Sequence, residues 1–221
     1  MKPFITRYFS FNTILLSLIL FAGVPTSFAN ETTATTNQKI LVVGDSLSAA
    51  YGIRQEQGWV HLLQQYLSDN KTSTYSAYQV INASISGETT GGALARLPKL
   101  LTLHQPNIII IELGGNDGLR GYPINILRSN LEQLVRLSKQ AQASVLITGI
   151  RIPPNYGQRY TQLFSTSYQL IAQKYQATLV PFLLDDVAIH PQLMQADGIH
   201  PTAEAQAQIL QNVLPYLKRL F

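Results

Sequence analysis

Residues 40–48, ILVVGDSLS, pass from a continuous apolar run into a short polar loop, and this transition decides the fold. Four consecutive aliphatic residues that end at Gly44 are typical of a parallel strand buried on both faces. The run Ile108–Ile111 has the same character and is followed by two glycines, Gly114 and Gly115. Both runs therefore predict central strands of a parallel sheet.

Three further apolar segments alternate with stretches of helical periodicity. Strands are expected at 78–83, 145–150 and 179–182, and helices at 59–67, 91–104, 124–137, 160–175 and 201–214. Pro98 is expected to kink or shorten its helix. Five strands alternating with helices, without internal repeats, predict an α/β fold: a three-layer α/β/α sandwich with a five-stranded parallel sheet, in a flavodoxin-like arrangement. In such sheets the chemistry collects in loops at the carboxyl ends of the strands.

Composition and charge exclude several classes of protein. With 46% hydrophobic and 9% aromatic residues in 221, the chain is not disordered and has room for one full-sized core. Lys2 and Arg7 supply half of the net charge of +4, which leaves 14 basic against 12 acidic residues beyond Ala29. This balance disfavours a nucleic-acid partner and, with the lack of heptads, favours a monomer. The absence of cysteine excludes disulfides, thiol catalysis and Cys-zinc sites.

The amino terminus has the pattern of an export signal. Lys2 and Arg7 precede the apolar run 14–22, which is too short to span a bilayer, and Ser27-Phe28-Ala29 predicts cleavage after Ala29. We expect a signal peptide at 1–29, a flexible tail at 30–38 and a single domain at 39–221. The protein would then be periplasmic or secreted, without a membrane span after cleavage. An uncleaved membrane anchor is the alternative.

Three of the strand-end loops contain a residue that could act on a substrate. Ser46 follows the first strand, where its hydroxyl could lie near a helix N-terminus that stabilises an oxyanion, or could simply cap that helix. Gly87 follows the second strand as an N–H donor or an ordinary turn glycine. Asn116 follows the third strand and offers a carboxamide, although Asn-Asp-Gly is also a turn signature. Asp117 is assigned no chemistry.

The last loop, Asp197-Gly198-Ile199-His200-Pro201, carries the most information. Its spacing lets the Asp197 carboxylate accept from Nδ1 of His200 while Nε2 acts as a base. A pairing of His190 with Asp185 or Asp186 is an alternative. Signatures of dinucleotide, phosphate-loop and zinc-hydrolase sites are absent, and Ser48 stands where the α/β-hydrolase elbow needs glycine. These residues predict nucleophilic catalysis by serine.

In order and spacing, the four loops resemble the sequence blocks of the SGNH, or GDSL, hydrolases. Gly44-Asp45-Ser46-Leu47-Ser48 is similar to the first block, Gly87 to the second, 114–117 to the third and 197–201 to the fifth. Further similarity to the bacterial periplasmic thioesterase I/protease I/lysophospholipase group, which is arylesterase-like, lies at 82–87, 95–98, 112–121 and 154–157. Ala50 departs from this group, whose close members have glycine there.

This resemblance implies that Ser46 is the nucleophile, His200 the general base and Asp197 the residue that orients it. The oxyanion hole would consist of the backbone N–H groups of Ser46 and Gly87 and the side-chain amide of Asn116. The implied activity is hydrolysis of carboxylic ester and thioester bonds through an acyl-enzyme, with a small-molecule or lipid acyl ester as substrate. No metal or cofactor is implied.

The resemblance also implies where an acyl group would bind. In this family the loop after the third block shapes the acyl groove, which points to Leu119 and Tyr122 within 118–123, and Ile152 would lie in the opposite wall at 150–156. Two other functions remain open. One is a carbohydrate O-deacetylase of the same superfamily. The other is a non-catalytic, flavodoxin-like binding protein in which Ser46 only caps a helix.

Overall fold

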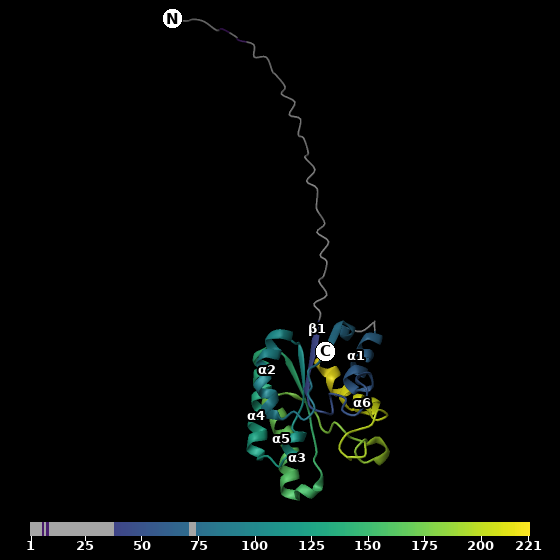
Figure 1. Cartoon of the computed structure of the whole chain (residues 1–221). Coiled ribbons are helices and arrows are strands. Elements are labelled where there is room, and N and C mark those ends of the chain that lie inside the picture. Colours follow the sequence, from purple (N-terminus) through teal and green to yellow (C-terminus); the bar gives the residue numbers. More distant parts are fainter. Residues whose placement is uncertain (1–5, 7, 9–37, 71–73) are drawn as a thin grey trace. The chain divides into compact units, whose positions relative to one another are not determined.

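The computed structural model describes residues 6, 8, 38–70 and 74–221 (Figure 1). Apart from residues 6 and 8, the expected signal peptide at 1–29 lies outside the described residues, as do residues 30–37 of the expected tail. Gln38, the last residue assigned to that tail, already belongs to the first strand. Within the described ranges, no helix has the length and apolar character needed to cross a membrane.

A parallel five-stranded sheet forms the centre of the described domain. Its strand order is β2-β1-β3-β4-β5, and the strands are β1 Gln38–Gly44, β2 Tyr78–Asn82, β3 Ile108–Glu112, β4 Ser144–Thr148 and β5 Thr178–Val180. All four pairings are parallel, and Gly44 of β1 lies opposite Glu112 of β3. The predicted fold class is confirmed, with each strand at its expected place.

Helices cover both faces of this sheet. In the described part of the chain the α-helices are α1 Trp59–Asp69, α2 Thr90–His104, α3 Gly115–Leu119, α4 Ile124–Gln140, α5 Gln158–Tyr175 and α6 Gln206–Leu217. Short 3-10 helices are found at Gln55–Gln57, Thr74–Ala77, Pro154–Tyr156, Pro191–Leu193 and Lys218–Leu220. Helices α2, α4 and α5 lie on one side of the sheet, and α1 and α6 on the other (Figure 1).

The alternation of strand side chains explains this three-layer arrangement. Ile40 and Val42 of β1 belong to the apolar cluster that includes residues of α1 and α6. Leu41 and Val43 belong to the cluster that includes residues of α2, α4 and α5. Because successive side chains of a strand point to opposite faces, an uninterrupted aliphatic run needs a covering layer on each side.

One expected helix boundary was wrong, and one expected effect of a proline is not seen. The last helix begins at Gln206 instead of Pro201, because Pro201 forms an antiparallel bridge with Met194. Pro98 does not shorten α2, which continues to His104. Pro98 is exposed, so the carbonyl that loses its N–H donor there can be solvated. The displaced start of α6 matters for the site, since the bridge closes the loop that contains Asp197 and His200.

Candidate active site

The structure brings Ser46 together with Asp197 and with His200, which lies 154 residues further along the chain. Nε2 of His200 lies 2.9 Å from Oγ of Ser46, and Nδ1 of His200 lies 2.6 Å from Oδ2 of Asp197. Ser46 follows β1, whereas Asp197 and His200 lie in the loop before α6. The hydroxyl, the imidazole and the carboxylate form a hydrogen-bonded chain in this order. The imidazole can therefore accept the hydroxyl proton while the carboxylate fixes the tautomer.

Hydrogen bonds keep the Asp197 carboxylate ionised. Burial raises its pKa, but this effect is outweighed by hydrogen bonds from the His200 side chain and from the backbone N–H groups of His200 and Ile199, which lower the pKa of Asp197 to about 2. The alternative pair does form, since Nε2 of His190 lies 3.1 Å from Oδ1 of Asp186. Both of those side chains are largely exposed and neither lines the cavity described below.

The turn that carries Ser46 differs from the expected geometry. No α-helix starts at Ser46: residues 46–51 form turns, and α1 begins only at Trp59. The carboxylate of Asp45, and not the Ser46 hydroxyl, accepts the turn's backbone N–H, from Leu47 at 3.1 Å. Ser46 is therefore not a helix cap, and its hydroxyl is directed to His200 instead.

A buried pair of carboxyl groups supports this turn. Oε2 of Glu112, at the end of β3, accepts from the Asp45 N–H at 3.2 Å and from the Ser48 hydroxyl at 2.8 Å. Burial and the Asp45 charge raise the pKa of Glu112 well above its usual value. Burial also raises the pKa of Asp45 to about 6, although hydrogen bonds from Leu47, Glu112 and Asn116 oppose the rise. Neither role was predicted from the sequence, where the available signal was an acidic residue at the end of the aliphatic strand β3.

The raised pKa of Asp45 has a consequence for stability. Between pH 3.8 and about pH 6 the folded protein holds a proton on Asp45 that the unfolded chain has released. The contribution of Asp45 to the free energy of unfolding therefore falls as the pH rises through that range. The free energy of unfolding of Asp45→Asn, relative to wild type, should therefore increase from about pH 4 to about pH 7. Urea denaturation at both pH values measures this shift. Asp69→Asn, which removes an exposed carboxyl, is the control, and parallel pH dependences for all three proteins would contradict the prediction.

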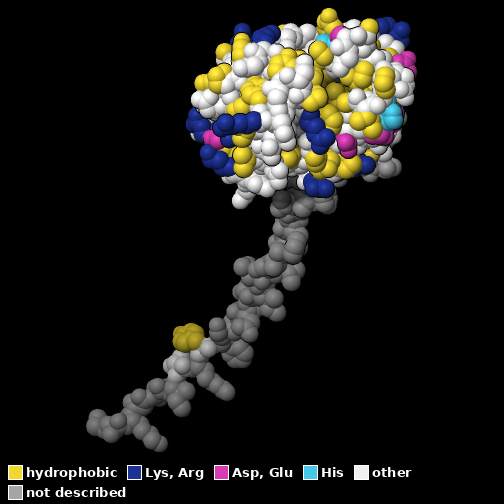
Figure 2. Space-filling model, turned by 90° about the horizontal axis from the view of Figure 1, so that it is seen from below, with side chains coloured by type: hydrophobic (Ala, Val, Ile, Leu, Met, Phe, Trp, Pro, Cys, Tyr) yellow, Lys and Arg dark blue, Asp and Glu magenta, His cyan; other side chains and the backbone are white. Residues whose placement is uncertain are grey.

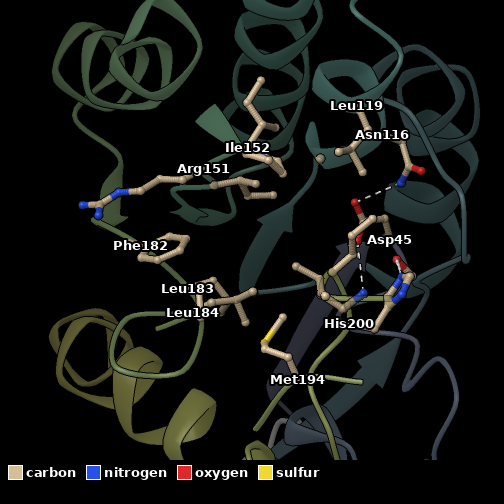
Figure 3. Close-up of a pocket in the computed structure, with 18 of the residues that line it drawn as sticks. Asp45, Asn116, Leu119, Arg151, Ile152, Phe182, Leu183, Leu184, Met194 and His200 are labelled. Carbon is tan, nitrogen blue, oxygen red and sulfur yellow. Dashed lines mark hydrogen bonds between the residues drawn. The ribbon is translucent and has the colours of Figure 1, made fainter. Parts of the chain in front are cut away.

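Asn116 reaches the site from a short helix, whose Asn-Asp-Gly stretch is also a turn signature in the sequence. Helix α3 follows Gly114, whose φ of 115° lies in the left-handed region and whose Cα faces the Tyr168 hydroxyl without room for a Cβ. Nδ2 of Asn116 donates to Oδ2 of Asp45 at 3.2 Å (Figure 3). An amide nitrogen has two hydrogens, so the second remains for a ligand oxygen.

Asp117, to which the sequence assigned no chemistry, has a structural role. It is buried and accepts from both the backbone N–H and the hydroxyl of Thr90, at 2.9 and 2.5 Å. These bonds join α3 to the first residue of α2. They fix the loop of Asn116 relative to the loop of Gly87, which ends where α2 begins.

Gly87 lies in the loop after β2, with a φ of 78°. Its carbonyl accepts from Nη2 of Arg120 at 3.2 Å, and the nearby Ile85 N–H donates to the Gly44 carbonyl at 3.0 Å. The loop is thus attached both to the end of β1 and to the segment after α3. Gly87 does not line the cavity, and its role as an oxyanion donor stays a prediction.

A cavity of about 410 Å³ opens beside the Ser46 hydroxyl. Leu119 and Ile152 line it, as the sequence predicted for an acyl groove, whereas Tyr122 does not and accepts at its carbonyl from the Tyr160 hydroxyl. A second apolar wall was missed: it consists of Phe182, Leu183, Leu184, Ala188 and Met194 (Figure 3). Seen from the end of the sheet where β3 leads into α3, apolar side chains gather around a hollow (Figure 2).

The chain is similar to known hydrolases over most of its length. The model of the GDSL-like lipase/acylhydrolase family matches residues 42–208. Esterase TesA of Pseudomonas aeruginosa is 50% identical over 183 residues, which cover 83% of this chain and 89% of that protein. Thioesterase 1/protease 1/lysophospholipase L1 of Escherichia coli is 44% identical over 173 residues, 78% of this chain and 80% of that protein.

A solved structure is similar over nearly the same span. The psychrotrophic esterase EstA from a Pseudoalteromonas species, inhibited by monoethylphosphonate, superposes with a TM-score of 0.77 at 46% identity. The match covers 82% of this chain and 97% of that chain.

Proposed function

Since the chain belongs to the GDSL-like lipase/acylhydrolase family and is an ester-hydrolysing enzyme, we propose that it cleaves acyl esters and thioesters through a covalent acyl-enzyme on Ser46. The observation that carries this proposal is the hydrogen-bonded order Ser46–His200–Asp197 at the mouth of an apolar cavity. The chemistry needs a nucleophile, a base and an oriented carboxylate, and these three residues supply them.

The reaction proceeds in two halves. Nε2 of His200 takes the Ser46 proton as Oγ attacks the acyl carbonyl carbon, and the carbonyl oxygen becomes an oxyanion. When the tetrahedral intermediate collapses, His200 returns the proton to the departing alcohol or thiol, and the acyl group remains esterified to Ser46. A water molecule then attacks with His200 again as base, and collapse releases the carboxylic acid and restores the Ser46 hydroxyl.

The proposed oxyanion hole comprises the N–H groups of Ser46 and Gly87 and the free amide hydrogen of Asn116. Asn116 lines the cavity next to Ser46, which supports its assignment. Its hydrogen bond to Asp45 holds the amide before substrate arrives, so little reorganisation is needed as charge develops on the oxyanion.

The proposed acyl site lies between two apolar walls. Leu119 and Ile152 contribute to one wall, and Phe182 and Met194 to the other. Burial of methylene groups between such walls stabilises binding by about 0.8 kcal/mol for each group. An acyl chain therefore fits this cavity better than a sugar, which disfavours the carbohydrate O-deacetylase.

We further propose that the enzyme is exported and acts as a monomer. The export proposal is supported by Lys2, Arg7, the apolar run 14–22 and the small residues of Ser27-Phe28-Ala29. Mass spectrometry of protein recovered from the expressing cells tests it, since cleavage after Ala29 leaves Asn30 as the first residue.

Two measurements test the activity. A fluorophosphonate probe should label Ser46 of the wild type, and the absence of labelling would indicate the non-catalytic binding protein. Rates on p-nitrophenyl esters of increasing chain length should peak beyond acetate, whereas a maximum at acetate would favour the deacetylase. Acyl-CoA and lysophospholipid assays then compare thioesters with lipid esters.

A further inference from the structure

The segment that contains Asp197 and His200 is a closed hairpin. Met194 and Pro201 form an antiparallel bridge, and the Gln195 N–H donates to the His200 carbonyl at 2.7 Å. The Gly198 N–H donates back to the Gln195 carbonyl at 2.9 Å. These bonds hold the hairpin in shape, but they do not fix its position relative to Ser46, which lies 154 residues away.

The side chain of Gln195 also binds outside the hairpin, to the turn at residues 46–51 that carries Ser46, here called the nucleophile turn. Its Nε2 donates to the Pro201 carbonyl at 3.0 Å and to the Tyr51 carbonyl at 2.9 Å, so both amide hydrogens are used. The Gln195 amide lies so close to Gly52 that a Cβ at Gly52 would collide with it. Since Tyr51 lies 144 residues before Gln195 in the sequence, the Gln195 side chain links two loops that are distant along the chain.

Tyr51 receives this bond and contacts both reacting residues. Its N–H donates to the Ser46 carbonyl at 3.2 Å, which makes Tyr51 part of the nucleophile turn. Its ring lies against the imidazole of His200, with ring centroids 4.4 Å apart and a tilt of 40°. Tyr51 therefore contacts the backbone of Ser46, the ring of His200 and the side chain of Gln195.

The exposure of these side chains argues against a role in the core. The Tyr51 residue is 51% exposed and belongs to neither apolar cluster, while the His200 side chain that it covers is only 17% exposed. An aromatic residue left half in solvent gains little from burial. Its position is explained by what it covers.

On the basis of the proposed function, we propose that Tyr51 and Gln195 form a latch that holds the base hairpin against the nucleophile turn and so sets the Ser46–His200 geometry. Gln195 is a positioning residue. Tyr51 in addition covers the imidazole, and when His200 holds the Ser46 proton its positive charge lies 4.4 Å from the centre of the Tyr51 ring, within the range at which an aromatic ring attracts a cation. The charged groups that face His200 are Asp197 in its own hairpin and Asp45 directly before the nucleophile turn.

Loss of the latch should lower kcat and leave KM nearly unchanged, because the cavity is intact and only the reacting atoms are displaced. Gln195→Met keeps the length of the side chain but has no donor, and we expect kcat to fall about 10-fold. Gln169→Met, an exposed substitution on α5, is the matched control and should retain wild-type rates. A Gln195→Met enzyme with wild-type kcat would overturn the proposal.

Variants of Tyr51 separate the ring from the backbone. Tyr51→Phe keeps the ring and every backbone bond and should stay within about twofold of wild type, whereas Tyr51→Leu should lose about 3- to 10-fold in kcat. In the Tyr51→Leu background, Gln195→Met should cost less than in the wild type, because the two residues act as a unit. Fully additive losses, or a Tyr51→Phe enzyme as slow as Tyr51→Leu, would contradict the latch.

Two controls keep this test separate from others. Melting temperatures identify a purely structural role: a variant that melts earlier yet keeps kcat counts against the latch. Fluorophosphonate labelling of the wild type reports on the proposed function alone. If the wild type is not labelled at Ser46, the proposed function fails; if it is labelled and active while Gln195→Met matches it, only the latch fails.

Discussion

Replacement of Ser46 by alanine is expected to lower kcat for ester hydrolysis by about 10⁴- to 10⁶-fold. Ser46 is the proposed nucleophile, and its Oγ lies 2.9 Å from Nε2 of His200, which is the proposed base. The cavity walls and the proposed oxyanion donors stay in place and are expected to supply the residual rate. Initial rates on a p-nitrophenyl ester with a medium-length chain measure the loss, and circular dichroism should show an unchanged fold because Ser46 is only half-buried.

A second substitution shows whether Ser46 acts with His200. His200→Ala alone should cost about as much as Ser46→Ala, and the double variant should be hardly slower than either single variant, because the residues of a catalytic unit lose their effect together. Ser46→Ala with wild-type rates would remove Ser46 from the mechanism. Two single losses that multiply in the double variant would mean that Ser46 and His200 act separately.

Local patterns were enough to predict the sheet and the residues that meet at its carboxyl edge. An aliphatic run such as Ile108–Ile111 indicates a doubly buried strand wherever it occurs, and the parallel order of the strands then brings Ser46, Asn116 and His200 to one side. The tip of the last loop was equally local, because Asp197 and His200 are three residues apart. Each of these inferences needed only neighbours in the sequence.

The features that were missed depend on contacts between distant residues. The last helix starts later than expected because Pro201 pairs with Met194, and the Asn-Asp-Gly turn signature lies in a short helix after the left-handed Gly114. The bond from Gln195 to Tyr51 spans 144 residues and has no sequence signature. The paired burial of Asp45 and Glu112 requires the register of β1 against β3 to be known. Side-chain type alone did not distinguish Tyr122, which does not line the cavity, from Leu119, which does.

Removal of the Asn116 side chain tests the oxyanion hole directly. Asn116→Ala is expected to lower kcat about 10²- to 10³-fold, the usual loss for one preorganised donor. KM should change little, because a donor aimed at the tetrahedral oxyanion binds the flat carbonyl of the substrate only weakly. The loss should therefore appear equally in kcat and kcat/KM, as measured on one p-nitrophenyl ester over a range of concentrations.

The matched control for this substitution is Asn125→Ala, which removes an exposed carboxamide from α4 and should leave both constants unchanged. Asn116→Ala also removes the hydrogen bond from Asn116 to Oδ2 of Asp45, so the melting temperature of the variant has to be measured together with its rate. Loss of the bond to Asp45 would lower the melting temperature whether or not substrate is bound. An Asn116→Ala enzyme that melts like the wild type and has a low kcat therefore supports the donor role. A rise in KM at constant kcat would instead place Asn116 in ground-state binding, and an unaltered kcat would leave the oxyanion to the backbone N–H groups alone.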